Sequence, residues 1–250
     1  MVKLNGAKEH INSLKFEFDE FLKKGPYEFV VHYDKDRTQG NIIVRVKEEA
    51  PIFRWSVLIG DSIHNLRAAL DYLVCQLIVS GQSQIGRESG FPIYRNLEGY
   101  NSSRSRNLKG ICPRAEHIIN RLKPYGSGGI ESYWRLNQVD VYDKHRLLVA
   151  AIDTPRQIMF KPSSAWKKLI RPETLTLYRL PHPLVDGTKI MSFPIPPEAR
   201  GENLDPDSLE ATWDIRLLTP PEVEGRFISS VFAEFNCVVE KTVRILSRLI

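Results

Sequence analysis

Residues 59–73 read Ile59-Gly-Asp-Ser-Ile-His-Asn-Leu-Arg-Ala-Ala-Leu-Asp-Tyr-Leu73, and this stretch combines a core face with a polar face. At about 100° per residue, its Ile and Leu side chains fall on one broad side of a helix. His64, Arg67 and Asp71 fall on a neighbouring face, one turn apart, beside Gly60. The spacing predicts a helix that packs on one side and presents a polar column on another.

Periodic apolar residues predict four more helices around this one. Residues 4–24 repeat apolar side chains at three and four positions and stop at Gly25-Pro26, and Pro51 opens the central helix. The predicted helices are residues 4–24, 51–80, 114–122, 130–152 and 222–250. Residues 81–113 are rich in Gly, Ser, Asn and Arg, which predicts a long surface loop with an extended piece at Phe91–Tyr94.

β-rich segments occur early and late in the chain. Tyr27–Tyr33 and Asn41–Lys47 flank a charged turn and predict a hairpin. Four short late segments predict a small antiparallel sheet: Arg156–Lys161, Thr174–Leu180, Lys189–Ile195 and Ala211–Leu218.

Together these elements predict an α+β fold, an antiparallel bundle of about five helices with an N-terminal β-hairpin and a small late antiparallel sheet. We expect one domain, 1–250, with the bundle core from 1–152 and 222–250 and a β-rich insertion at 153–221.

Composition excludes disordered, collagen-like and disulfide-scaffold chains, since 42% of the 250 residues are hydrophobic and 26% are charged. Charges interrupt the apolar stretch Trp55–Val79, so no membrane span is expected, and no signal peptide is expected from the charged N-terminus. Three cysteines without paired spacing, Cys75, Cys112 and Cys237, indicate a reducing compartment. These features predict a cytoplasmic protein.

The net charge of +5 is unevenly placed. Residues 95–124 hold seven basic and two acidic side chains, whereas residues 198–224 hold eight acidic and two basic ones. This pattern fits a polyanion-binding face, and it equally fits two segments that neutralise each other or are simply solvated.

A second polar group lies at residues 137–146. Asn137, Asp140 and Lys144 are three or four positions apart, and Asp140 with Lys144 is a favourable helix pair that needs no function. His145 aligns with apolar positions and is expected to face inward. If two such helices pack about 8–10 Å apart, His145, Lys144 or Arg146 meets His64 and Arg67.

These side-chain types suit acid–base chemistry on a phosphate. A histidine moves a proton, an arginine holds an oxyanion, and an aspartate orients either of them. The sequence has no Gly-rich phosphate loop, nucleophile elbow or dense metal-ligand spacing. We therefore expect no cofactor and no metal site.

Two resemblances follow from these residues. The stretch Gly60-Asp61-x-x-His64-Asn65-Leu66-Arg67-x-Ala69-Leu70-Asp71 resembles a signature of a widespread family of uncharacterised bacterial proteins, and Asp143-Lys144-His145-Arg146 resembles its second signature. Leu122–Tyr125 and Phe91–Ile93 are similar to minor landmarks of that family. This similarity spans residues 1–150 and implies no activity.

The chain more weakly resembles the HEPN superfamily, helical proteins that include metal-independent ribonucleases. Their pattern is Arg followed four to six residues later by His; here Arg67 is followed at the fifth position by Tyr72. The resemblance implies an RNA-directed protein, a metal-independent endoribonuclease of bacterial defence or toxin type, and a homodimer. The motif itself matches only at Arg67. With the chemistry of the other side chains, we expect His64, His145, Arg67 and Asp71 to be catalytic and Lys144, Arg146 and Asn65 to bind the substrate.

Two other interpretations remain open. In one, the His/Arg/Asp column is a buried network that fixes the helix packing of a non-catalytic interaction or ligand-sensing protein, whose partner protein the sequence does not identify. In the other, Trp134, Tyr133 or Trp55 lines a small-molecule pocket between the bundle and the late sheet.

Overall fold

The structure is a computed structural model that describes residues 2–146, 148, 150–152, 157–160, 174–178, 184–201, 203 and 209–250. Its fold is α+β, as predicted. Contacts divide the chain into two compact units. The helical unit contains Met1–Phe16, Phe53–Ala150 and Leu217–Ile250, and the β-rich unit contains Glu17–Ile52 and Ala151–Arg216. The expected single domain with an insertion at 153–221 stays a prediction.

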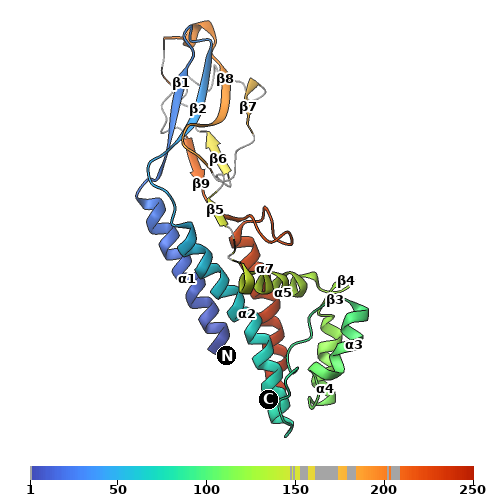
Figure 1. Cartoon of the computed structure of the whole chain (residues 1–250). Coiled ribbons are helices and arrows are strands. Elements are labelled where there is room, and N and C mark those ends of the chain that lie inside the picture. Colours follow the sequence, from blue (N-terminus) through green and yellow to red (C-terminus); the bar gives the residue numbers. More distant parts are fainter. Residues whose placement is uncertain are drawn as a thin grey trace. The chain divides into compact units, whose positions relative to one another are not determined.

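The described residues hold six α-helices (Figure 1). Their bounds are α1 (Val2–Lys23), α2 (Ile52–Ser80), α3 (Leu97–Asn107), α4 (Pro113–Leu122), α5 (Glu131–His145) and α7 (Ile228–Leu246). The helices predicted at 4–24, 51–80 and 114–122 are confirmed. The apolar face of α2 is buried along its length, from Trp55 through Ile63 and Leu70 to Ile78. This face forms the core of the helical unit, because few of its side chains retain contact with water.

The predicted loop at 81–113 is wrong for residues 97–107, which form α3. Asn96 caps this helix, because its side-chain oxygen accepts the backbone N–H of Gly99 at 2.9 Å. Only Tyr100 of α3 is buried, so the helix lacks the apolar stripe on which the prediction relied. Strand β3 (Tyr94–Asn96) before it pairs in parallel with β4 (Tyr125–Ser127) after α4.

Two of the predicted helix ends also differ. Helix α5 ends at His145 rather than near residue 152, since Arg146 is extended and Ala150–Ile152 forms β5. Helix α7 begins at Ile228 rather than residue 222. Gly225 adopts a φ of +75°, in the left-handed region, so the turn before α7 does not continue as a helix. A 3-10 turn, η4 (Ser247–Leu249), follows α7.

The predicted hairpin is confirmed as β1 (Tyr27–Tyr33) and β2 (Gln39–Val46), which pair antiparallel with Val31 opposite Ile42. The late strands form antiparallel pairs as predicted, but two of them join the hairpin. β8 (Thr188–Pro194) pairs with β2, and β7 (Thr176–Leu177) pairs with β8, so the order is β1-β2-β8-β7. The fully buried side chain of Val44 on β2 explains this arrangement, since a hairpin alone leaves such residues in water.

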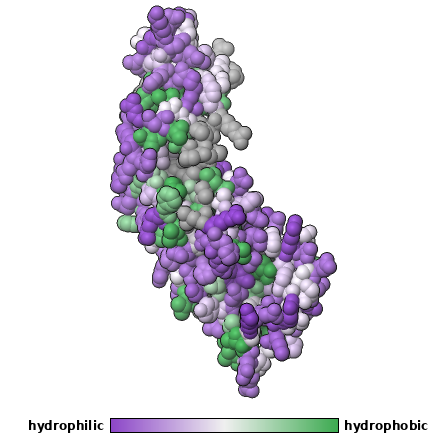
Figure 2. All heavy atoms as spheres, viewed as in Figure 1, coloured by the Kyte–Doolittle hydropathy of each residue, from purple (hydrophilic) through white to green (hydrophobic). Residues whose placement is uncertain are grey.

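The remaining strands form two short ladders. β6 (Gln157–Phe160) pairs antiparallel with β9 (Leu209–Thr212), and β5 (Ala150–Ile152) pairs with β10 (Ile215–Leu217). A short 3-10 helix, η2 (Pro197–Ala199), follows β8. Among the described helices, none is long and apolar enough to cross a membrane. Hydrophilic residues cover most of the face in Figure 2, and apolar residues form small separate patches on it.

Candidate functional site

The polar column of α2 meets the polar face of α5 through His64 and Asp140. His64 Nδ1 lies 2.9 Å from Asp140 Oδ1. The Asp140 side chain is 3% exposed, and the His64 side chain is 47% exposed. The second oxygen, Oδ2, accepts Lys144 Nζ at 2.6 Å. A buried carboxylate is thus bonded on both oxygens, by an imidazole and an ammonium that both reach solvent.

This pairing determines what the imidazole can do. When Nδ1–H donates to the Asp140 carboxylate, the proton of the neutral ring is fixed on Nδ1 and Nε2 is left as the basic nitrogen. Within the described ranges, Nε2 of His64 makes no hydrogen bond. The arrangement therefore offers an oriented, solvent-accessible base.

Arg67, one turn further along α2, donates hydrogen bonds to three different partners. Its Nε donates to Asn137 Oδ1 at 3.0 Å, its Nη1 to Asp71 Oδ1 at 2.6 Å, and its Nη2 to the Phe91 carbonyl at 3.1 Å. Asp71 Oδ1 also accepts the Phe91 N–H at 2.8 Å. The Arg67 side chain is only 14% exposed. This network holds α2, α5 and the segment at Phe91 together; Arg67 is nearly closed to water, whereas the Asp71 side chain is 39% exposed.

Gly60 leaves room on α2 for the Asp143 side chain of α5. A Cβ at this position would lie 2.6 Å from Cγ of Asp143, closer than real Cβ atoms come to a neighbour. Burial raises the pKa of the Asp143 carboxyl above its ordinary 3.8. The negative charges of Asp140 and Asp61 act in the same direction, whereas the Leu148 backbone N–H and His64 oppose them. The Asp143 carboxyl therefore lies at the contact between α2 and α5, where burial disfavours its ionised form.

The structure brings some predicted site residues together and separates others. His64, Arg67, Asp71 and Lys144 lie along the α2–α5 contact. The expectation that His145 faces inward is wrong, because its side chain is exposed at the end of α5. Arg146 is also exposed, with its guanidinium carbon 5.8 Å from the Tyr142 ring centre.

The Asn65 side chain lies beside α1 rather than α5. Its amide donates to the Asp61 carbonyl at 2.9 Å, and its carboxamide carbon would lie 3.6 Å from a Cβ on Gly6 of α1. Asn65 therefore belongs to the α1–α2 contact.

Asp140 and Asn137 are the site residues that sequence reasoning missed. Their three- and four-residue spacing with Lys144 places all three on one face of α5. The sequence shows this spacing, but an Asp and a Lys four residues apart can pair within one helix, so the spacing alone does not indicate a contact with α2. Only the packing against α2 shows that Asp140 also orients His64.

Two of the three aromatic residues of the pocket interpretation, Trp55 and Tyr133, have core roles. Trp55 and Tyr133 are fully buried, and the Tyr133 hydroxyl lies 2.5 Å from Thr242 Oγ1. Trp134 lies beside Gly126, whose added Cβ would be 3.1 Å from the indole. Trp55 and Tyr133 therefore line no open pocket.

The basic segment forms a surface of its own, the α3–α4 basic module, defined as residues 94–127. Six of its seven cationic side chains are exposed: Arg95, Arg106, Lys109, Arg114, Arg121 and Lys123. Arg104 is half-buried, donates to Asn120 Oδ1 at 2.8 Å and lies 3.6 Å from Glu116. Of the six exposed cations, only Arg106 has an ion pair within the part of the chain that is described, with Glu88 at 3.6 Å. The module is thus an exposed cationic surface in the same unit as His64.

Within the same described ranges, no group of three His, Cys, Asp or Glu side chains is arranged to hold a metal ion. Comparisons of the chain with protein-family models, with curated proteins and with solved structures found no match. The resemblances to the bacterial family and to the HEPN superfamily therefore stay predictions.

Proposed function

We propose that the chain is an RNA-directed, HEPN-like protein that cleaves RNA without a metal ion, of the bacterial defence or toxin type. The observation that carries this proposal is the half-exposed His64 imidazole held by the buried Asp140 carboxylate. An oriented imidazole of this kind is the group most often used to move protons near neutral pH. In this proposal His64 is the catalytic residue and Asp140 is a positioning residue.

The proposed reaction uses the ribose 2′-hydroxyl as the nucleophile. His64 Nε2 removes the 2′-hydroxyl proton, and the 2′ oxygen forms a bond to the adjacent phosphorus. The bond from phosphorus to the 5′ oxygen breaks, and this oxygen takes a proton from water. The products are a 2′,3′-cyclic phosphate and a 5′-hydroxyl, and His64 returns its proton to solvent.

Positive charge near His64 would stabilise the pentavalent phosphorus. Lys144 shares the Asp140 carboxylate with His64, and its side chain is 49% exposed. Arg146, exposed just past the end of α5, adds a second cation. Arg67 is a weaker candidate for this role than the sequence indicated, because Asn137, Asp71 and Phe91 already occupy its guanidinium.

The α3–α4 basic module supplies the remaining contacts with the substrate. Phosphate contacts by exposed Lys and Arg give binding that does not depend on base sequence and weakens with salt. The proposal also keeps three expectations made from sequence: a bundle of about five helices, a cytoplasmic location and a homodimer.

The experiment that tests the proposal compares two oligonucleotides in EDTA. One is RNA, and the other has the same sequence with 2′-deoxyribose throughout. We expect the wild-type chain to cleave only the RNA and to leave cyclic phosphate ends, and His64→Ala to cleave neither. Intact RNA, or equal cleavage of the deoxy strand, would refute the proposed reaction.

A second candidate function is a non-catalytic interaction protein, and the Arg67 network favours it. Three hydrogen bonds on a guanidinium that is nearly closed to water are typical of a side chain that holds segments together. If the whole column has this role, truncating His64 destabilises the fold as truncating Arg67 does. The melting temperatures of the two variants therefore separate the two candidates.

A further inference from the structure

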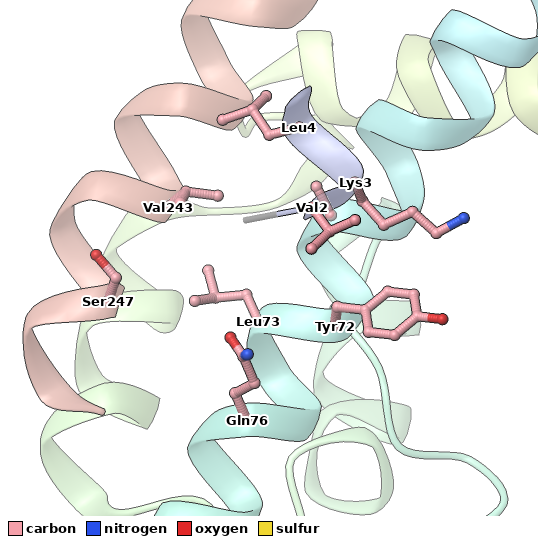
Figure 3. Close-up of a pocket in the computed structure, with 9 residues that line it drawn as sticks. Val2, Lys3, Leu4, Tyr72, Leu73, Gln76, Val243 and Ser247 are labelled. Atoms are coloured by element: carbon pink, nitrogen blue, oxygen red, sulfur yellow. The ribbon is translucent and has the colours of Figure 1, made fainter. Parts of the chain in front are cut away.

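A cavity of about 230 Å³ opens in the helical unit between the start of α1, the second half of α2 and the end of α7 (Figure 3). It is formed by nine residues: Val2, Lys3, Leu4, Ala69, Tyr72, Leu73, Gln76, Val243 and Ser247. Typical ligand pockets measure about 300–1,000 Å³, so this cavity suits a small ligand. It involves none of the residues proposed for RNA cleavage.

The wall of the cavity is apolar. Leu4, Ala69, Leu73 and Val243 are buried and come from three different helices. Val2 and Tyr72 are exposed and form its rim. In Figure 3 the Leu73, Val243 and Leu4 side chains extend toward the space between α2 and α7. An unbranched hydrocarbon chain would remove these surfaces from water.

Exposed cations line a second hollow beside the cavity. This hollow shares Leu4, Val243 and Ser247 with the cavity and adds Lys241, Arg244 and Arg248 near the end of α7. These three side chains are exposed, and none forms an ion pair with another described residue. The one acid of this hollow, Glu240, is already paired with Lys8 at 2.8 Å.

Polar groups at the edge complete the site. Lys3 Nζ lies 5.9 Å from the centre of the Tyr72 ring, at the rim. The Gln76 amide on α2 and the Ser247 hydroxyl after α7 lie on either side of the cavity in Figure 3. An amide N–H and a hydroxyl can both donate hydrogen bonds to an anionic oxygen.

We propose that this cavity binds a medium-chain fatty-acid anion. The hydrocarbon chain lies against Leu4, Leu73 and Val243, and the carboxylate faces Arg244 and Arg248 with help from Gln76 and Ser247. The apolar wall favours a hydrocarbon chain as ligand, and the unpaired cations favour a ligand with a negative charge. This inference does not depend on the proposed ribonuclease activity.

The test is isothermal titration of the whole chain with sodium butanoate, hexanoate and octanoate, and with octanol. We expect saturable binding of octanoate, and affinity rising about fourfold for each methylene that becomes buried. Octanol should bind more weakly than octanoate. No saturable octanoate binding, or octanol binding as tightly as octanoate, would overturn the proposal.

Variants show whether binding occurs at this place. Ala69→Leu fills the cavity and should abolish octanoate binding, and Val243→Phe provides a second filling variant if the first does not fold. Arg244→Gln with Arg248→Gln should weaken octanoate about tenfold and leave octanol unchanged. Arg114→Gln on α4 is the matched control and should bind as the wild type does. Octanoate affinity that is unchanged in the folded filling variants or in the charge variant would overturn the assignment.

Discussion

His64 on α2 and Asp140 on α5 are 76 positions apart in the chain, and their side chains meet with Nδ1 2.9 Å from Oδ1. The Asp140 carboxylate is buried and holds the imidazole in place, whereas the His64 imidazole is half-exposed and can be reached from solvent. A neighbouring pair, Arg67 and Asp71, is fixed on both sides by the Phe91 backbone and Asn137. Within the polar column of α2, the His64 imidazole thus keeps Nε2 accessible, whereas all three nitrogens of the Arg67 guanidinium are engaged in hydrogen bonds.

Asp140→Asn tests whether Asp140 orients His64. An amide in place of the carboxylate can donate to Nδ1 and favour the ring tautomer with its proton on Nε2, which is the wrong one for a base. We expect RNA cleavage to fall by about 10²- to 10⁴-fold. Rates are measured with a fluorescent RNA in EDTA, below the melting temperature of the variant.

Lys144→Gln is the control for this measurement, because it removes the other partner of Asp140 and leaves the pairing with His64. It should reduce the rate less than Asp140→Asn does. Cleavage by folded Asp140→Asn at the wild-type rate would show that the carboxylate does not position the base.

Gly60→Ala tests the close approach of the Asp143 side chain to α2. Alanine favours a helix by about 1 kcal/mol over glycine, but its Cβ would collide with the Asp143 carboxyl. The contact is with the end of the Asp143 side chain, which can rotate aside in part, so we expect a net loss of no more than about 1 kcal/mol in the free energy of unfolding. Chemical denaturation measures this change.

Asp143→Ala provides the internal control for Gly60→Ala. With the carboxyl removed, adding Gly60→Ala should no longer destabilise the chain and should instead give the helix-propensity gain of up to about 1 kcal/mol. If Gly60→Ala alone stabilises the chain, the Asp143 side chain is not in tight contact with α2 at this point.

Asp143 also predicts a pH dependence. Because burial raises its folded-state pKa above the ordinary 3.8, the unfolded chain releases this proton at a lower pH than the folded chain does. Between these two pKa values, the contribution of Asp143 to the free energy of unfolding falls as pH rises.

The Asp143→Asn variant has no such group. The stability of this variant relative to wild type should therefore increase with pH across this window and then level off. Denaturation of both chains from about pH 3 to about pH 7 measures the difference. A difference that decreases with pH would contradict this prediction.

The α3–α4 basic module predicts a salt dependence of RNA binding. Arg114 and Arg121 are exposed and lie seven residues apart, on the same face of α4. If both contact phosphates, replacing them with Gln should reduce the slope of log affinity against log salt by about 1.4, at about 0.7 per contact with single-stranded RNA.

Binding is measured in the His64→Ala background, so that the RNA stays intact. Lys35→Gln in the hairpin turn is the control and should keep the wild-type slope. An unchanged slope in the α4 double variant would exclude this surface.

Local patterns predicted α2 well because its apolar face repeats over eight turns of helix. Helix α3 was missed because only Tyr100 of its side chains is buried, and its one clear signal is the Asn96 cap. The pairing of β2 with β8 could not be predicted, because the alternation within each strand shows which face is apolar and does not identify the partner.

The same reasoning applies to the candidate site. The column of His64, Arg67 and Asp71 follows from helical spacing. The residues of α5 that contact it are Asp140 and Asn137, whereas Lys144 reaches His64 only through the Asp140 carboxylate that both side chains bind. The different environments of His64 and Arg67 could not be predicted, because they depend on how Asn137, Asp140 and Phe91 pack around α2.

The most direct test of the proposed role of His64 records RNA cleavage in EDTA and the melting temperature for wild type, His64→Ala and Arg67→Ala in parallel. We expect wild type to cleave RNA and His64→Ala to lose at least about 10²-fold in rate with little change in melting temperature. Arg67→Ala should lose about 2–4 kcal/mol of stability, because Asp71 and Asn137 lose their partner. Intact RNA with wild type, together with a lower melting temperature for His64→Ala, would contradict the catalytic role and make the whole column structural.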